Sequence, residues 1–111
     1  MTVLQTSRED LTKEDLYFLM VAESKKMADV AGQTINVKDW VLAQDDKDPE
    51  NIKTILFVRS DNETYATISN TFIESFQTVV QCFRSDFTKI KVKSNKSNKG
   101  RTFITCEYAK A

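Results

Sequence analysis

Apolar and polar residues alternate along residues 34–44, as expected for a strand with one buried face. One side of this stretch carries Ile35, Val37, Val41 and Ala43, and the other side carries Asn36, Lys38, Trp40 and Gln44. Runs rich in β-branched and aromatic residues predict four more strands, at residues 52–61, 64–69, 88–94 and 101–109. Short polar turns separate the second strand from the third and the fourth from the fifth, so each pair is predicted to form a hairpin.

The apolar spacing changes to a helical period from residue 70 onwards. Five large apolar residues recur at intervals of three and four positions, namely Phe72, Phe76, Val79, Val80 and Phe83. Ser69, Asn70 or Thr71 can serve as the N-cap, and Glu74 follows Thr71 by three residues. This pattern predicts a helix whose aromatic stripe faces the core.

The N-terminal segment is harder to interpret. Residues 1–11 are polar, and we expect them to be flexible. Thr12 and Asp15 have the spacing of a helix-capping box, but the run that follows, LYFLMVA, has no polar face. Residues 12–23 therefore form an extra element that is either a helix or a buried strand, and the missing polar face favours a strand. Apolar residues on both faces of 52–60 indicate that this strand is covered by the N-terminal segment or by a second subunit.

The predicted order is an N-terminal element, three strands, a helix and two strands, within a single domain spanning residues 1–111. This order is typical of a mainly β OB-fold, a five-stranded Greek-key barrel with its helix between strands 3 and 4. Sandwich folds of this size usually lack such a helix, so we favour the barrel.

Composition excludes several classes of function. The longest apolar run, residues 16–22, is too short to span a membrane, and the polar N-terminus does not resemble an export signal, so we expect a cytoplasmic protein. The chain contains no histidine, and Cys82 and Cys106 stand alone among apolar neighbours. We therefore expect two free thiols, no metal, no cofactor and no enzymatic activity.

Charge is divided unevenly along this neutral chain. Residues 1–83 contain 8 Lys/Arg and 14 Asp/Glu, a net charge of −6, whereas residues 84–111 contain 8 and 2, a net charge of +6. A basic region of this kind suggests a polyanionic partner, because binding depends on where charge lies and not on its total.

OB-folds bind single-stranded nucleic acid with a basic groove for phosphates and aromatic rings on which bases stack. The candidate binding residues are those that strand alternation or loop position places outward: Lys38, Trp40, Lys53, Phe57, Arg59, Tyr65, Lys89, Lys91, Lys93, Lys96, Lys99, Arg101 and Phe103. Two plainer interpretations stay open. The lysines of 88–94 are as well explained by a solvated strand face, and a register slip of one residue would turn Trp40 and Phe57 into the core.

Three segments in order carry a family resemblance: SKKMADVAGQTINVKDWVLAQ, KTILFVRSDNETYATISNTFIESFQTVV and KIKVKSNKSNKGRTFITCEY. Over roughly residues 24–108 the chain resembles single-stranded DNA-binding proteins of phages and mobile elements of Gram-positive bacteria, including those of protein-primed Bacillus phages. The resemblance implies an OB-like fold and non-specific coating of single-stranded DNA during DNA replication or recombination. By position it points to Tyr65, Lys91, Lys93, Lys99, Arg101 and Phe103, and less firmly to Lys38 and Trp40.

The partner expected from this resemblance is single-stranded DNA in the host bacterial cell. Self-association and contacts with phage or host replication proteins are compatible with it. A different class of function also fits the sequence: a small phage protein that uses an OB-like barrel to bind and inhibit a host protein, with the acidic part of the chain as its working surface.

Overall fold

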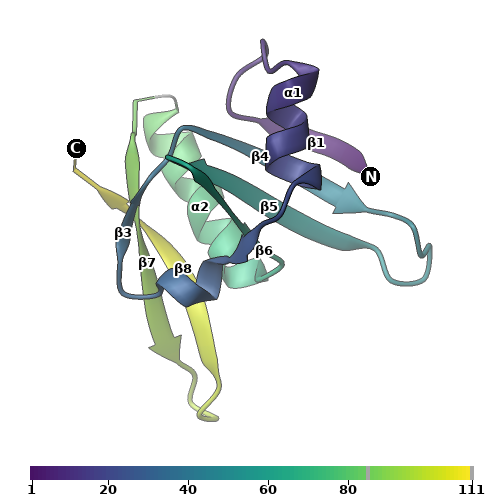
Figure 1. Cartoon of the computed structure of the whole chain (residues 1–111). Helices are drawn as coiled ribbons and strands as arrows, with labels where there is room; N and C mark the ends of the chain where they lie inside the picture. The colour runs from purple at the N-terminus through teal and green to yellow at the C-terminus, as the bar shows by residue number, and fades with distance from the viewer. Residues whose placement is uncertain (85, 111) are drawn as a thin grey trace.

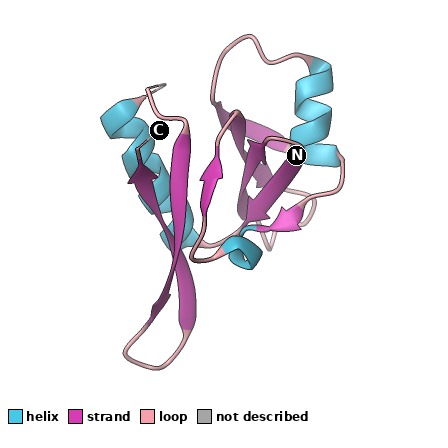
Figure 2. Ribbon diagram, turned by 60° about the vertical axis from the view of Figure 1, so that its left-hand side comes forward, coloured by secondary structure: helices cyan, strands magenta, loops and turns pink. Residues whose placement is uncertain are grey.

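The computed structural model describes residues 1–84 and 86–110, and it contains two β-sheets (Figures 1 and 2). The larger sheet has the strand order β1-β4-β5-β6-β2, and the smaller one has the order β3-β7-β8. The larger sheet consists of β1 (Thr2–Thr6), β4 (Asp39–Asp45), β5 (Lys53–Ser60), β6 (Glu63–Thr67) and β2 (Lys25–Lys26). The smaller consists of β3 (Thr34–Asn36), β7 (Lys89–Lys96) and β8 (Thr102–Ala109). The predicted mainly β class is confirmed, but no closed barrel is found, because no strand of one sheet pairs with a strand of the other among the described residues.

The first predicted strand, residues 34–44, divides into two strands that belong to different sheets. The break falls at Val37 and Lys38, whose backbone N–H groups donate to the carbonyls of Thr88 and Arg59, each at 2.8 Å. Val37 therefore bonds to the residue that precedes β7 of the smaller sheet, and the next residue, Lys38, bonds to β5 of the larger sheet. β3 continues antiparallel to β7, and β4 continues antiparallel to β5. This break joins the two sheets at one corner of the molecule.

The predicted helix is present as α2 (Asn70–Phe83), between β6 and β7 in the chain. Ser69 is the N-cap, and its hydroxyl accepts a hydrogen bond from the N–H of Phe72 at 3.3 Å. The helix lies along β8, where the Thr71 hydroxyl donates to the Ile104 carbonyl at 2.9 Å. It buries Phe72 and Phe76 in the core between the sheets.

The N-terminal element is a helix, so the preference for a strand was wrong. The capping box of Thr12 and Asp15 is formed in both directions, and it starts α1 (Lys13–Leu16), which continues as a π-helical turn, η1 (Tyr17–Val21). Part of the segment expected to be flexible, residues 2–6, forms β1 and pairs with β4. A short 3₁₀ turn, η2 (Met27–Val30), leads from β2 towards β3.

Two apolar clusters explain why strand alternation alone misleads here. The main core lies between the sheets and α2, and the second lies on the opposite face of β4 and β5. In the second cluster Leu19 of η1 packs with Val41, Ala43 and Phe57. One apolar face of β5 thus lies in the main core, and the other is covered by the N-terminal segment, which was one of the two predicted covers.

Candidate nucleic-acid interface

The outward surface of β3, β7 and β8 carries most of the lysines predicted to bind DNA. On β7 the side chains of Ile90 and Val92 are fully buried, so the alternating Lys89, Lys91 and Lys93 face away from the core. Lys91 is exposed, and the other two lysines are half-buried. We call this outward surface, together with the loop from Ser97 to Arg101, the basic face.

The hairpin loop at the end of the basic face is ordered by its own hydrogen bonds. The N–H of Ser97 donates to the Arg101 carbonyl at 2.8 Å, and the Arg101 N–H donates to the Ser97 hydroxyl at 3.1 Å. Gly100 has a φ of +81°, which glycine adopts without strain. Lys96, Lys99 and Arg101 are exposed here. In both views the hairpin projects beyond the rest of the molecule, so these cations lie on an extended arm (Figures 1 and 2).

Polar and aromatic groups accompany the lysines across the same surface. Register places Asn95 opposite Phe103, and Lys93 opposite Thr105. The Asn95 amide donates to the Thr105 hydroxyl at 2.9 Å, and Phe103 is half-buried. One acid, Glu107, lies opposite Lys91 and pairs with Lys93 at 3.0 Å. Cations, hydrogen-bonding groups and one aromatic ring, the kinds of group that contact phosphates and bases, therefore occur together on this face.

Trp40, Phe57 and Tyr65 do not lie on an outward surface, so their expected orientation was wrong. Their exposed fractions are 6%, 6% and 8%. The physical reason is that β4 and β5 are covered on both sides, by α2 and the smaller sheet on one and by η1 on the other. Trp40 meets the ring of Phe76 edge-on, with centroids 5.3 Å apart.

Tyr65 retains one polar contact at the margin of the core. Its hydroxyl donates to Glu63 at 2.8 Å, which raises the pKa of Tyr65 because the phenol proton is held by a carboxylate. Lys25 lies 2.6 Å from the other oxygen of Glu63 and lowers the pKa of that carboxyl. This short network ties β2 to β6, and it occupies the hydroxyl group of Tyr65.

The remaining predicted cations lie away from the basic face. Lys53 is exposed at the start of β5, opposite Asp45. Lys38 and Arg59 line a hollow of about 330 Å³ beside η1. Arg59 is half-buried, and its guanidinium donates to the Thr64 hydroxyl at 3.2 Å. The structure therefore brings the predicted residues from 89 to 103 onto one hairpin, with Lys96 on the opposite side of β7 from Lys89, Lys91 and Lys93.

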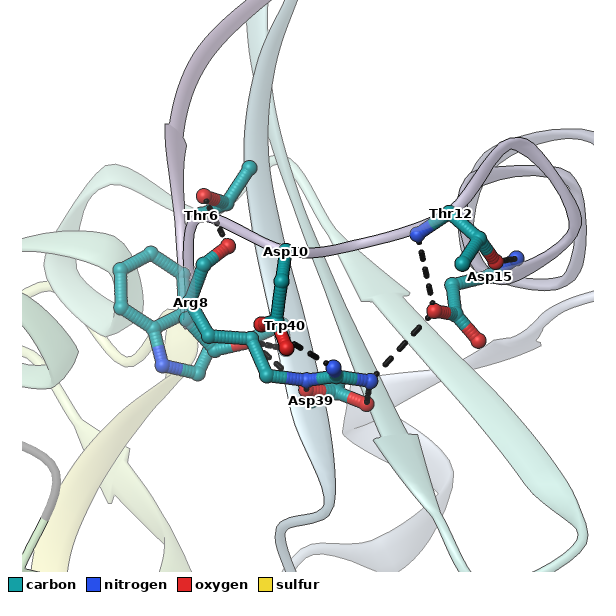
Figure 3. A network of polar contacts seen from close by, with 8 residues as sticks. Thr6, Arg8, Asp10, Thr12, Asp15, Asp39 and Trp40 are labelled. Atoms are coloured by element: carbon teal, nitrogen blue, oxygen red, sulfur yellow. Dashed lines mark hydrogen bonds and ion pairs between the residues drawn. The ribbon is translucent and has the colours of Figure 1, made fainter.

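A salt-bridge network missed by the sequence analysis holds the N-terminal segment to β4 (Figure 3). Arg8 lies 2.9 Å from Asp39, 3.1 Å from Asp10 and 3.4 Å from Asp15. Asp39 raises the pKa of Arg8, and the capping bonds from Thr12 lower the pKa of Asp15. Arg8 and Asp39 are 31 residues apart, and no local sequence pattern predicts that they pair.

The two cysteines differ in their surroundings. Cys106 is buried, which raises the pKa of its thiol to about 12, whereas Cys82 is exposed. Within residues 1–84 and 86–110, no group of three or more His, Cys, Asp or Glu side chains could hold a metal ion. Among the same residues, the helices are too short or too polar to cross a membrane.

A basic sheet face and a basic hairpin arm on a small mainly β scaffold define a nucleic-acid-binding protein as the class that fits best. The family model described as phage single-stranded DNA-binding protein, of the Phi29 type, matches residues 9–108. The chain therefore belongs to this family, as its sequence resemblance indicated, and the family consists of non-enzymatic proteins that bind single-stranded DNA. Comparisons with curated proteins and with solved structures gave no match.

Proposed function

We propose that this protein coats single-stranded DNA without sequence specificity and protects it during phage or mobile-element replication and recombination, in the cytoplasm of the host cell. Family membership supports single-stranded DNA binding in general. The observation that carries the proposal is the basic face, where five cations, Lys89, Lys91, Lys93, Lys99 and Arg101, accompany a single acid, Glu107. Such a surface attracts a phosphate backbone whatever its sequence.

We further propose that the scaffold is an open relative of the OB-fold. Several features support this interpretation: β4, β5 and β6 form an antiparallel meander, α2 follows, and β7 returns to pair with β3 before turning into β8. OB-folds are commonly only partly closed and bind oligonucleotides with a strand face and the loop between their last two strands. The loop from Ser97 to Arg101 has that position in this chain.

The proposal gives the residues of the basic face distinct roles. Lys89, Lys91 and Lys93 would contact successive phosphates along β7, with Lys99 and Arg101 extending the contacts along the arm. Lys96 lies on the opposite side of β7 and would contact a strand only where it wraps around the arm. Phe103, on the neighbouring strand β8, would stack on a base of the bound DNA. Base stacking contributes about 1–3 kcal/mol per base and is tolerant of sequence, which suits a coating protein.

A titration at two or more salt concentrations tests this function. Fluorescently labelled poly-dT and a duplex of equal length are titrated with the full chain. We expect binding to poly-dT, with log affinity falling against log salt at a slope of roughly −0.7 per phosphate contact, and weaker binding to the duplex. Absence of poly-dT binding at low salt would overturn the proposal and favour the inhibitor hypothesis, in which neither strand form is bound.

A further inference from the structure

Two adjacent aromatic side chains on η1 are exposed although the residues around them pack inward. Leu19 is fully buried, and Leu16 and Met20 pack beside it against β4 and β5. On the other side of the same turn, Tyr17 and Phe18 are 52% and 43% exposed. Their rings lie edge to face, with centroids 5.5 Å apart. A helix that is apolar on its outer side presents surface that a partner usually covers.

The backbone around this aromatic pair is held in an uncommon conformation. The N–H of Ala22 donates to the Tyr17 carbonyl at 2.9 Å, which is the five-residue spacing of a π-helix. Single π-turns are rare and occur frequently at functional sites. The extra residue in this turn accompanies two consecutive aromatic side chains that both point away from the core.

Contacts with β5 and β6 fix the position of Phe18. The hydroxyl of Thr64, which is itself buried, donates to the Phe18 carbonyl at 2.9 Å and accepts from Arg59 at 3.2 Å. The guanidinium of Arg59 also lies over the Phe18 ring, 5.8 Å from its centroid. The ring is thus positioned before any ligand arrives, which lowers the entropic cost of binding to it.

A chain of contacts connects the aromatic pair to the basic face. Asn36 lies opposite Lys89 in the register of β3 and β7, and its amide donates to Asp61 at 3.1 Å. Asp61 lines the hollow of about 330 Å³ that Phe18, Lys38 and Arg59 also line. The surface therefore continues from β7, past Asn36 and Asp61, to the rings of η1.

We propose that Tyr17 and Phe18 form a second base-stacking site, where a single strand lying along β7 continues past Lys38 and places its next bases on these rings. This inference rests on the proposed function and extends the binding site beyond the basic face. The ligand class is unpaired nucleobases, because exposed aromatic rings beside a phosphate-binding surface stack on bases of any sequence.

Charge around the aromatic pair predicts how this second site differs from the first. Lys38 and Arg59 face three carboxylates in the hollow. Two of these, Asp15 and Asp39, pair with Arg8, and Asp61 accepts from Asn36. Cations and anions are nearly balanced here, so the contribution of this site comes from stacking and depends little on salt. The basic face, by contrast, sets the salt dependence.

Oligonucleotide length provides the first test. From Lys89 to Lys96, β7 is about 23 Å long at roughly 3.3 Å per residue. A dT oligonucleotide of about 5 nucleotides can therefore bind the basic face alone, whereas one of about 16 nucleotides can also reach η1. The double variant Tyr17→Leu with Phe18→Leu retains apolar volume and removes both rings. We expect roughly five- to a hundredfold weaker binding of the long oligonucleotide, unchanged binding of the short one and an unchanged salt slope.

Three controls keep this test interpretable. Val21→Ala alters another exposed apolar residue of η1 and should leave both affinities unchanged. Tyr17→Trp should bind the long oligonucleotide at least as well as the native chain. Far-ultraviolet circular dichroism and the thermal midpoint report whether the double variant is folded.

Ultraviolet cross-linking of the native chain to dT of about 16 nucleotides, read by mass spectrometry, should place a cross-link at Tyr17 or Phe18.

Several outcomes would overturn the second site. Equal loss for short and long oligonucleotides would mean that the variant acts on the basic face or on folding. Unchanged binding of the long oligonucleotide, or a change only in self-association, would assign the aromatic pair to something other than DNA. In either of the last two cases poly-dT binding itself persists, so the proposed function would stand while this inference fails.

Discussion

The carboxylate of Glu107 on β8 pairs with the ammonium group of Lys93 on β7, with 3.0 Å between Oε1 and Nζ. Both side chains are about half exposed to solvent, so the pair adds little to folding stability, about 0–1 kcal/mol. Its position matters more, because Glu107 is the acid within the row of lysines on the basic face. It partly neutralises a cation that would otherwise contact phosphate.

Replacing this acid should strengthen DNA binding. We expect Glu107→Gln to tighten binding to poly-dT roughly two- to fivefold at low salt, since it releases Lys93 and removes a repulsion of the size of a surface ion pair. Glu74→Gln, an exposed acid on α2, is the matched control and should have no effect. Equal effects of both changes in a salt-dependent binding titration would mean that only net charge matters.

Reversing two lysines should weaken binding without unfolding the domain. In the variant Lys91→Glu with Lys93→Glu, we expect lower affinity for poly-dT and a salt slope smaller by roughly 0.7 for each lost phosphate contact. The control Lys26→Glu with Lys47→Glu makes the same charge change on β2 and in the β4–β5 loop. Unchanged affinity in the first variant would return these lysines to the role of a solvated strand face.

Trp40 should report on the core and not on DNA. As the single tryptophan of the chain, buried against Phe76, it should show blue-shifted emission and weak quenching by acrylamide, with or without dT of about 16 nucleotides. Trp40→Phe should leave affinity within roughly twofold, whereas Phe103→Leu should weaken it five- to a hundredfold, or about 1–3 kcal/mol. Strong quenching of Trp40 by DNA would contradict its burial in the bound state.

The cap of α1 should be sensitive to acid. The pKa of Asp15 is lowered in the folded chain, mainly by the capping bonds with Thr12. Its carboxylate therefore stabilises the helix at neutral pH, and this stabilisation is lost as the pH falls below about 4, through the lower pKa of the folded state. Hydrogen exchange of the amides in residues 13–22 should accelerate over that range.

Two variants of the cap separate this effect from general acid unfolding. Thr12→Ala should destabilise the N-terminal helix by about 0.5–2 kcal/mol at neutral pH. The backbone N–H of residue 12, which donates to Asp15 and is the largest cause of its lowered pKa, is retained in this variant, so part of the acid sensitivity of residues 13–22 should remain. Asp15→Asn has no carboxylate to protonate and should remove it. Exchange in Asp15→Asn that is as acid-sensitive as in the native chain would show that protonation of a different group opens residues 13–22.

The two cysteines should differ in reactivity. Burial raises the pKa of Cys106 to about 12, so its thiol stays protonated at neutral pH, while Cys82 is exposed. We expect a thiol-reactive reagent to label one cysteine in the native chain at pH 7–8 and two in denaturant, with the native label on Cys82. Rapid labelling of Cys106 in the native chain would mean that β8 opens from α2.

Local patterns in the sequence were sufficient for some elements. The spacing of Phe72, Phe76 and Val79 predicted α2 because an amphipathic helix with one buried face leaves its period in the sequence. The alternation of lysines with Ile90 and Val92 likewise predicted the outward lysine face of β7. The order of the three sequence segments between residues 24 and 108 also carried the family resemblance, which the family model confirms.

Other features depended on which elements meet in three dimensions. The aromatic residues of β4, β5 and β6 were expected to face outward, yet both faces of this sheet are covered, and alternation cannot distinguish a surface from a second core. The run LYFLMVA lacks a polar face, which favoured a strand, whereas the tertiary structure makes it a helix whose outer aromatic residues remain exposed.

The mainly β class, the central helix, the basic hairpin and the family could all be predicted from the sequence, because each depends on residues close together in the chain or on their order. The burial of Trp40 and Tyr65, the pairing of Arg8 with Asp39 and the exposure of Tyr17 and Phe18 became visible only in three dimensions. Burial and ion pairing between distant segments follow from packing, and the packing of a strand depends on which elements cover each of its two faces.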